Sequence, residues 1–165
     1  MAMIRTERLL LRPPRPDDLP AMHRILSDPA AMRYWSSLPH AGIDETRLWL
    51  DAMMGAPAGE NCDFIVDLDG QAIGKAGCHR LPEIGYILDP AHCGRGYAAE
   101  AVEAAIRHIF ATRDVAALRA DVDPRNHASI RLLERLGFEP VGSASRTWLI
   151  GDEYCDSLYF ELRRR

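Results

Sequence analysis

Two glycines, Gly94 and Gly96, stand one residue apart directly before a stretch with helical periodicity. The apolar residues of that stretch recur at helical spacing, at Ala98, Ala101, Val102, Ala105, Ile106 and Ile109. The first turn of a helix carries backbone N–H groups without partners and the positive end of the helix dipole, so it stabilises an anion. Because glycine has no Cβ, an anion can approach the loop backbone closely. The stretch predicts a phosphate-binding loop, with an ordinary strand-to-helix turn as the alternative.

The loop also matches the dinucleotide-binding fingerprint, as Gly94-x-Gly96-x-x-Ala99. That fingerprint follows its strand at once and belongs to a series of strand–helix–strand units. Here residues 89–93 separate the loop from the strand before it, and one further helical pattern follows the loop helix. The spacing therefore favours another phosphate-containing ligand over a dinucleotide.

The elements before the loop are predicted from periodicity and from helix and turn signals. Residues 4–12 read as one strand, and residues 16–26 as a helix that opens on a proline and two aspartates. A second helix is predicted to begin at an Asp44 cap and to end before Gly55, with Leu48 on its apolar face. Residues 64–77 predict a β-hairpin that turns at Asp69-Gly70.

The elements around and after the loop predict a parallel crossover. Residues 83–88 and 118–122 read as strands separated by the loop helix, so they should run parallel through a right-handed connection. A helix capped by Asn126 then ends at Gly137. The final segments read as strands over residues 138–141, 147–150 and 154–162. The pattern predicts a mixed sheet with helices on both faces.

Length and composition narrow the classes of protein. The chain has 165 residues, so we expect a single domain spanning residues 1–165. No apolar run approaches the roughly 20 residues that cross a bilayer, and the N-terminus lacks a signal-peptide pattern, so we expect a cytoplasmic protein without membrane contact. The formal net charge of −4 argues against nucleic-acid binding. The cysteines and histidines show no metal-ligand spacing, so we expect no metal.

Two motifs together resemble the GNAT superfamily of acyl-CoA N-acyltransferases. The first is the glycine loop with its helix start, residues 94–101, and the second is residues 123–138, which begin Asp-Pro-Arg-Asn. Residues 6–12, 83–86 and 151–156 extend the similarity to the branch that includes the ribosomal-protein alanine N-acetyltransferases. The resemblance covers the whole chain. It implies an α+β fold with a mostly antiparallel sheet of about seven strands and one splayed parallel pair.

The resemblance also implies acetyl-CoA as co-substrate. Its pyrophosphate would lie on the amides of residues 94–98, and its pantetheine arm would lie between the splayed strands 83–88 and 118–122. Arg125 is a further candidate to meet phosphate charge. The residues expected to bind the coenzyme are Ile87, Leu88, Cys93, Gly94, Arg95, Gly96, Tyr97, Ala98, Asn126, Ser129 and Arg131.

The resemblance implies direct attack of an amine on the thioester, which requires a proton acceptor and a proton donor. Glu83, beside the expected gap, is the candidate base, with a solvated strand-end charge as the alternative. Many family members donate the proton from a tyrosine at the position of Leu133, and here Ser129 is the candidate substitute. The alternative for Ser129 is a purely structural role at the helix start.

The sequence is best interpreted as an N-acetyltransferase acting on a primary amine, either a protein N-terminal α-amine or a small-molecule amine. A non-catalytic acyl-CoA-binding or regulatory module is the alternative. The acceptor is expected near residues 30–44, which include His40, and a homodimer is the candidate assembly. The residues expected to border the acceptor are Tyr34, Trp35, Glu83 and Tyr86.

Overall fold

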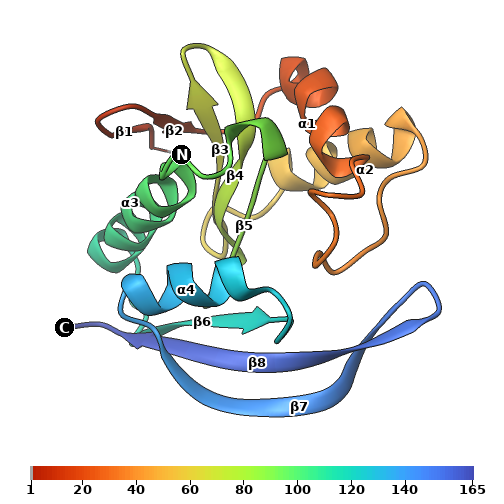
Figure 1. Cartoon of the computed structure of the whole chain (residues 1–165). Helices are drawn as coiled ribbons and strands as arrows, with labels where there is room; N and C mark the ends of the chain where they lie inside the picture. Colours follow the sequence, from red (N-terminus) through yellow and green to blue (C-terminus); the bar gives the residue numbers. More distant parts are fainter. Residues whose placement is uncertain (1) are drawn as a thin grey trace.

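The computed structural model describes residues 2–165 and has an α+β architecture built on one mixed sheet (Figure 1). The strands are β1 (Ile4–Arg5), β2 (Leu10–Arg12), β3 (Cys62–Leu68), β4 (Gln71–Arg80), β5 (Glu83–Leu88), β6 (Ala117–Val122), β7 (Glu139–Ile150) and β8 (Glu153–Arg163). The helices are α1 (Leu19–Leu26), α2 (Ile43–Met54), α3 (Tyr97–Thr112) and α4 (His127–Arg135), with short 3-10 turns at η1 (Pro16–Asp18) and η2 (Pro90–His92). The eight strands lie in the order β1-β2-β3-β4-β5-β6-β8-β7, and β5 with β6 is the parallel pair. The predicted fold class is confirmed, with one strand more than the seven expected.

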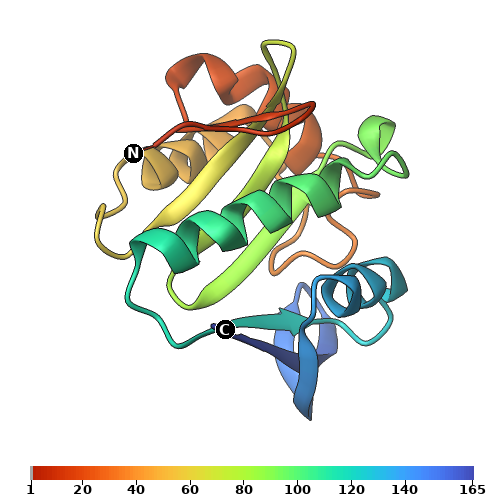
Figure 2. The ribbon, with the colours of Figure 1, turned by 90° about the vertical axis from the view of Figure 1, so that its left-hand side faces the viewer.

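Helices cover both faces of the sheet, with α3 on one face and α1 and α2 on the other (Figure 2). Successive side chains of a strand point to opposite faces, and β3 follows this rule. Phe64 and Val66 pack in one cluster with Val102 of α3, whereas Ile65 packs in a second cluster with Met22 of α1. The central strands are therefore buried on both faces and form a fixed base for the loops at their ends.

The first strand prediction is wrong in detail. Residues 4–12 form a hairpin of β1 and β2, in which Ile4 pairs with Leu11. The Thr6 amide donates to the Leu9 carbonyl at 2.9 Å, the Leu9 amide donates to the Thr6 hydroxyl oxygen at 2.9 Å, and these bonds close the turn. The side-chain hydrogen bonds of a threonine thus interrupt what hydrophobic patterning alone reads as one strand.

The predicted strands at residues 138–141 and 147–150 are parts of one long strand, β7. It pairs antiparallel with β8, and the register shifts between Ala144 and Trp148. Arg146, inside this irregular stretch, has a positive φ of 54°. The irregular stretch explains why the sequence pattern reads as two strands.

Helix α2 begins earlier than predicted. Its N-cap is Gly42, so Asp44 lies inside the first turn and is not the cap. Leu48 is 71% exposed, which contradicts its placement on the apolar face. The buried residues of this helix are Thr46, Leu50 and Met53, which follow the helical spacing of four and three residues. The buried side of this helix therefore includes a polar residue, Thr46, which hydrophobic periodicity does not identify.

Two buried ion-pair networks tie the N-terminal half together. Arg12 of β2 donates two bonds to Asp18 of η1, at 2.9 and 2.7 Å, and one to Asp67 of β3, at 2.7 Å. Lys75 of β4 lies 2.8 Å from Asp63 of β3. Removing one partner of a buried pair leaves the other charge without compensation, so the loss of one of these side chains should destabilise the fold.

The described chain has few features beyond this scaffold. All four cysteines are free thiols, and Cys62 and Cys78 are buried. Across residues 2–165, no group of three or more His, Cys, Asp or Glu side chains is arranged to hold a metal ion. Over the same residues, no helix combines the length and the apolar character needed to cross a bilayer.

Candidate active site

The glycine loop has the geometry that its composition predicts. Gly94 and Gly96 have positive φ values of 78° and 83°, a region that glycine enters without steric cost. Gly96 is the N-cap of α3, and no side chain within the described residues makes a capping hydrogen bond there. The amides of the first helical turn are therefore open to an external anion.

The loop is braced by the N-terminal hairpin, through contacts that sequence reasoning missed. Glu100 of α3 accepts bonds from the Thr6 hydroxyl at 2.5 Å and from the backbone and side chain of Arg8 at 2.8 and 2.7 Å. Partial burial raises the pKa of Glu100, but these hydrogen bonds outweigh it and hold the pKa below its usual value. Arg8 also donates to the Arg95 carbonyl at 2.8 Å. The hairpin thus fixes the loop at one end.

Strands β5 and β6 separate beyond their first residues. Glu83 and Arg119 are the single paired position, and the Arg119 amide donates to the Pro82 carbonyl at 2.9 Å. Further along, residues of both strands line cavities, including Ile84 and Tyr86 from β5 and Val122 from β6. The pair therefore opens toward its carboxyl ends.

The larger of the two cavities beside the split, of about 830 Å³, runs between the glycine loop, the split strands and α4 and is called the loop cavity. The residues expected to bind the coenzyme that line it are Ile87, Leu88, Cys93, Gly94, Gly96, Tyr97, Ala98, Asn126, Ser129 and Arg131. Arg95 is absent from this lining, although its carbonyl is held by Arg8. Arg125 lies on the other cavity, so the structure does not support it as a phosphate contact.

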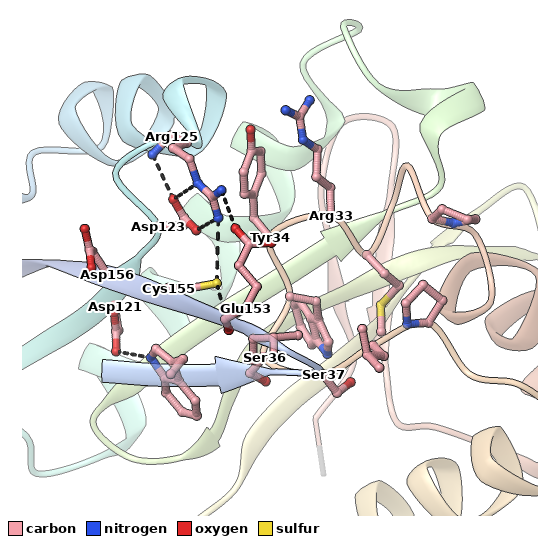
Figure 3. A pocket seen from close by; sticks show the side chains of 18 of the residues that line it. Arg33, Tyr34, Ser36, Ser37, Asp121, Asp123, Arg125, Glu153, Cys155 and Asp156 are labelled. Atoms are coloured by element: carbon pink, nitrogen blue, oxygen red, sulfur yellow. Dashed lines mark hydrogen bonds and ion pairs between the residues drawn. The ribbon is translucent and has the colours of Figure 1, made fainter. Parts of the chain in front are cut away.

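The smaller cavity, of about 420 Å³, lies between the segment after α1, the start of β5, the end of β6 and the β7–β8 hairpin (Figure 3). It is called the acceptor cavity after the residues that the sequence predicts to border an acceptor. Tyr34, Trp35 and Glu83, which the sequence predicts to border the acceptor, line this cavity. Tyr86 lines the loop cavity instead. His40 lines neither cavity, because its ring bonds to the Thr46 hydroxyl at 2.8 Å.

Several residues that line the acceptor cavity were not predicted to lie there. They are Asp121, Asp123, Arg125, Trp148, Glu153, Cys155 and Asp156. Arg125 joins two of them: its guanidinium donates to Asp123 at 2.7 Å and to Glu153 at 2.6 Å (Figure 3). The Asp-Pro-Arg-Asn motif marks two of these positions, but nothing local assigns them to this cavity.

The acceptor cavity carries an excess of negative charge. Its lining holds five carboxylates, from Glu83, Asp121, Asp123, Glu153 and Asp156, against two guanidiniums, from Arg33 and Arg125. The Arg125 hydrogen bond lowers the pKa of Asp123, so this carboxylate stays ionised at neutral pH. Such a lining is complementary to a cation or to a neutral amine that becomes cationic during reaction.

Three side chains meet where α4 approaches β5. The Asn126 side chain accepts from the Ser129 amide at 3.2 Å, which confirms Asn126 as the predicted helix cap. The Ser129 hydroxyl lies 2.5 Å from the Tyr86 hydroxyl. Burial raises the pKa of Tyr86 to about 12, although the bond to Ser129 opposes this rise. Tyr86 and Ser129 both line the loop cavity.

Comparison with known proteins places this geometry in a family. Residues 8–139 match the acetyltransferase (GNAT) domain. An uncharacterized N-acetyltransferase p20 of Bacillus licheniformis is 30% identical over 152 residues, covering 86% of this chain and 85% of that protein. The [Ribosomal protein uS5]-alanine N-acetyltransferase of Escherichia coli is 37% identical over 73 residues, covering 44% of this chain and 38% of that enzyme.

A solved structure shares the fold over nearly the whole chain. The ribosomal L7/L12 alpha-N-protein acetyltransferase RimL in complex with coenzyme A superposes with a TM-score of 0.83 at 19% identity, covering 98% of both chains. The predicted family and the resemblance to its ribosomal-protein branch are thereby confirmed. The chain belongs to the GNAT family of acetyltransferases and is an acyltransferase.

Proposed function

We propose that this chain transfers an acetyl group from acetyl-CoA directly to a primary amine. The observation that carries the proposal is the continuity of the uncapped amides at α3, the loop cavity and the split between β5 and β6. A ligand with a diphosphate at one end and a long polar arm fits this sequence of surfaces. In the RimL structure the bound ligand is coenzyme A, which supports the same assignment here.

The residues of the loop cavity fit the expected chemistry of the coenzyme. Open amides and the positive end of a 16-residue helix meet the diphosphate, and Arg131 supplies additional positive charge from α4. Ile87 and Leu88 line the loop cavity in the part of β5 that does not pair with β6, so the backbone there is suited to hydrogen-bond the amides of the arm as a neighbouring strand would. Acetyl-CoA would supply the activated acyl group, and the chain would position it.

The acceptor is an amine in this proposal because of the charge around Glu83. An α-amine has a pKa near ~8 and is mostly protonated at neutral pH, so a carboxylate that attracts the cation and accepts its proton favours attack. Glu83 lines the acceptor cavity and is itself the residue of β5 that pairs with β6. A protein N-terminal α-amine is the acceptor class suggested by the uS5-alanine relative, and a small-molecule amine is the other class compatible with the cavity.

Thiol release from acetyl-CoA tests the proposal. The purified chain is mixed with acetyl-CoA and with peptides that begin in alanine or serine, or with di- and polyamines, and free thiol and acetylated product are followed together. Peptides whose N-terminus is already acetylated serve as matched controls. We expect thiol release in step with amide formation for at least one free amine and none for blocked peptides. Tight acetyl-CoA binding without turnover on any amine would support a non-catalytic binding module instead.

A further inference from the structure

A hydroxyl pair links the split strand to the helix that closes the loop cavity. Tyr86 comes from the middle of β5, and Ser129 comes from the first turn of α4. Their oxygens lie 2.5 Å apart although 43 residues separate them in the chain. Both residues line the loop cavity, so the pair faces the space in which the thioester arm is proposed to lie.

The usual position of the family's proton-donating tyrosine has no access to this cavity. Leu133 occupies that position, and its side chain is fully buried in the main core cluster. It does not line the loop cavity. A hydroxyl that serves the leaving sulfur must therefore come from elsewhere, and Ser129 and Tyr86 supply two adjacent ones.

The relative acidity of the two hydroxyls favours one direction of the hydrogen bond between them, although either oxygen can be the donor. A phenol has a pKa near ~10, far below that of an aliphatic alcohol, so it is the stronger donor. The Tyr86 phenol is protonated at neutral pH, as any tyrosine is, and burial raises its pKa further, to about 12. The Ser129 amide is already bonded to the Asn126 side chain, which fixes the position of the serine backbone. With the phenol donating to Ser129 Oγ, the serine hydrogen stays free to point into the cavity.

We propose, on the basis of the proposed function, that Tyr86 is a positioning residue that orients Ser129 Oγ–H toward the leaving sulfur of the thioester. The C–N bond forms as the C–S bond breaks, and the proton lost by the amine nitrogen replaces the acyl group on sulfur. Tyr86 therefore donates a hydrogen bond throughout and loses no proton overall. A donor that itself accepts a hydrogen bond is polarised, which strengthens the bond from Ser129 to the negatively charged sulfur.

A double-mutant cycle tests whether the two hydroxyls act as one unit. Tyr86→Phe keeps the ring and removes only the hydroxyl, and we expect kcat to fall about tenfold, as for loss of one oriented hydrogen bond, with KM for acetyl-CoA unchanged. Ser129→Ala should lower kcat at least as much, and the double variant should be no slower than Ser129→Ala alone. The matched control is Tyr159→Phe, which removes a hydroxyl from β8 that lines neither cavity. A wild-type kcat for Tyr86→Phe, or an equal tenfold drop in the Ser129→Ala background, would overturn the proposal.

A second measurement needs no turnover. The thiol of coenzyme A is titrated in its binary complex with the protein by the ultraviolet absorbance of the thiolate. We expect the thiol to titrate at higher pH in the Tyr86→Phe and Ser129→Ala complexes than in wild type, because the oriented donor stabilises the thiolate. Identical titrations in wild type and Tyr86→Phe would contradict the role of Tyr86. A wild-type chain that binds coenzyme A but acetylates no amine would refute the proposed function and still leave this titration as a test of the pair.

Discussion

Replacing Gly96 with valine perturbs the glycine loop at the position that Arg8 crowds. Gly96 has a φ of 83°, and a residue with a Cβ held in this left-handed region costs roughly 1–2 kcal/mol. A Cβ there would also lie 3.3 Å from the Arg8 guanidinium, which holds the loop through the Arg95 carbonyl. The loop of the variant should relax away from this conformation, so that ligand binding has to restore it.

The expected loss of affinity follows from that strain. Because about 1.4 kcal/mol changes a dissociation constant tenfold, coenzyme A should bind roughly 5- to 30-fold more weakly to Gly96→Val. Isothermal titration calorimetry at fixed salt measures the affinity, and urea denaturation establishes that the variant is folded. A folded Gly96→Val protein with wild-type affinity would refute the assignment of this loop to the diphosphate.

Gly42→Val is the matched control. Gly42 is also a helix N-cap, but its φ of −143° is open to any residue and no heavy atom lies within 4 Å of the position of an added Cβ. Valine is a poor cap, so we expect a loss of stability of roughly 1 kcal/mol. Coenzyme affinity should remain at the wild-type value, because Gly42 lines neither cavity.

Three other substitutions give independent tests. Glu83→Gln should lower kcat most at pH values below the pKa of the acceptor amine, and a pH profile of unchanged shape would remove Glu83 from the mechanism. Lys75→Met should lower the free energy of unfolding, measured in urea, by roughly 3–5 kcal/mol, because it leaves the buried Asp63 carboxylate without its partner. Adding Asp63→Leu should restore most of the lost stability. A double variant as unstable as the single variant would contradict this. Arg125 holds the pKa of Asp123 below its usual value, so the ionised carboxylate stabilises the fold at neutral pH and this contribution disappears as pH falls through the folded-state pKa. Asp123→Asn should therefore be less stable than wild type at pH 7, and the difference should shrink toward pH 3; a constant difference would argue against the pairing.

Sequence signals such as glycine positions, helix caps and periodicity predicted the parts of the structure that residues close together in the chain determine. The glycine loop, the Asn126 cap and the alternation of helix and strand around residues 83–122 all follow from backbone geometry and periodicity. The two GNAT motifs then extend those local elements to a family fold. The loop cavity could be predicted largely from such signals, because most of its lining comes from one continuous strand–helix–strand crossover and the helix that follows it.

The acceptor side was hard to predict because its residues come from four distant segments. The Trp148 indole donates a hydrogen bond to Asp121 at 3.0 Å, and the Arg125 guanidinium donates one to Glu153. Both contacts form because the β7–β8 hairpin folds over the end of β6. The hydrogen bonds between Glu100 and the N-terminal hairpin also join residues far apart in the sequence. From the sequence alone, a glutamate on the polar side of an amphipathic helix is expected to face solvent. Periodicity reports which side of an element is apolar, not which distant polar group it meets.

The most direct test is a crystal structure of this protein with acetyl-CoA bound. The expected result places the diphosphate within hydrogen-bond distance of the backbone amides of residues 94–98 and the pantetheine arm between β5 and β6, with the thioester sulfur next to Ser129. A diphosphate bound elsewhere, or β5 and β6 closed against each other with the arm outside the loop cavity, would contradict it.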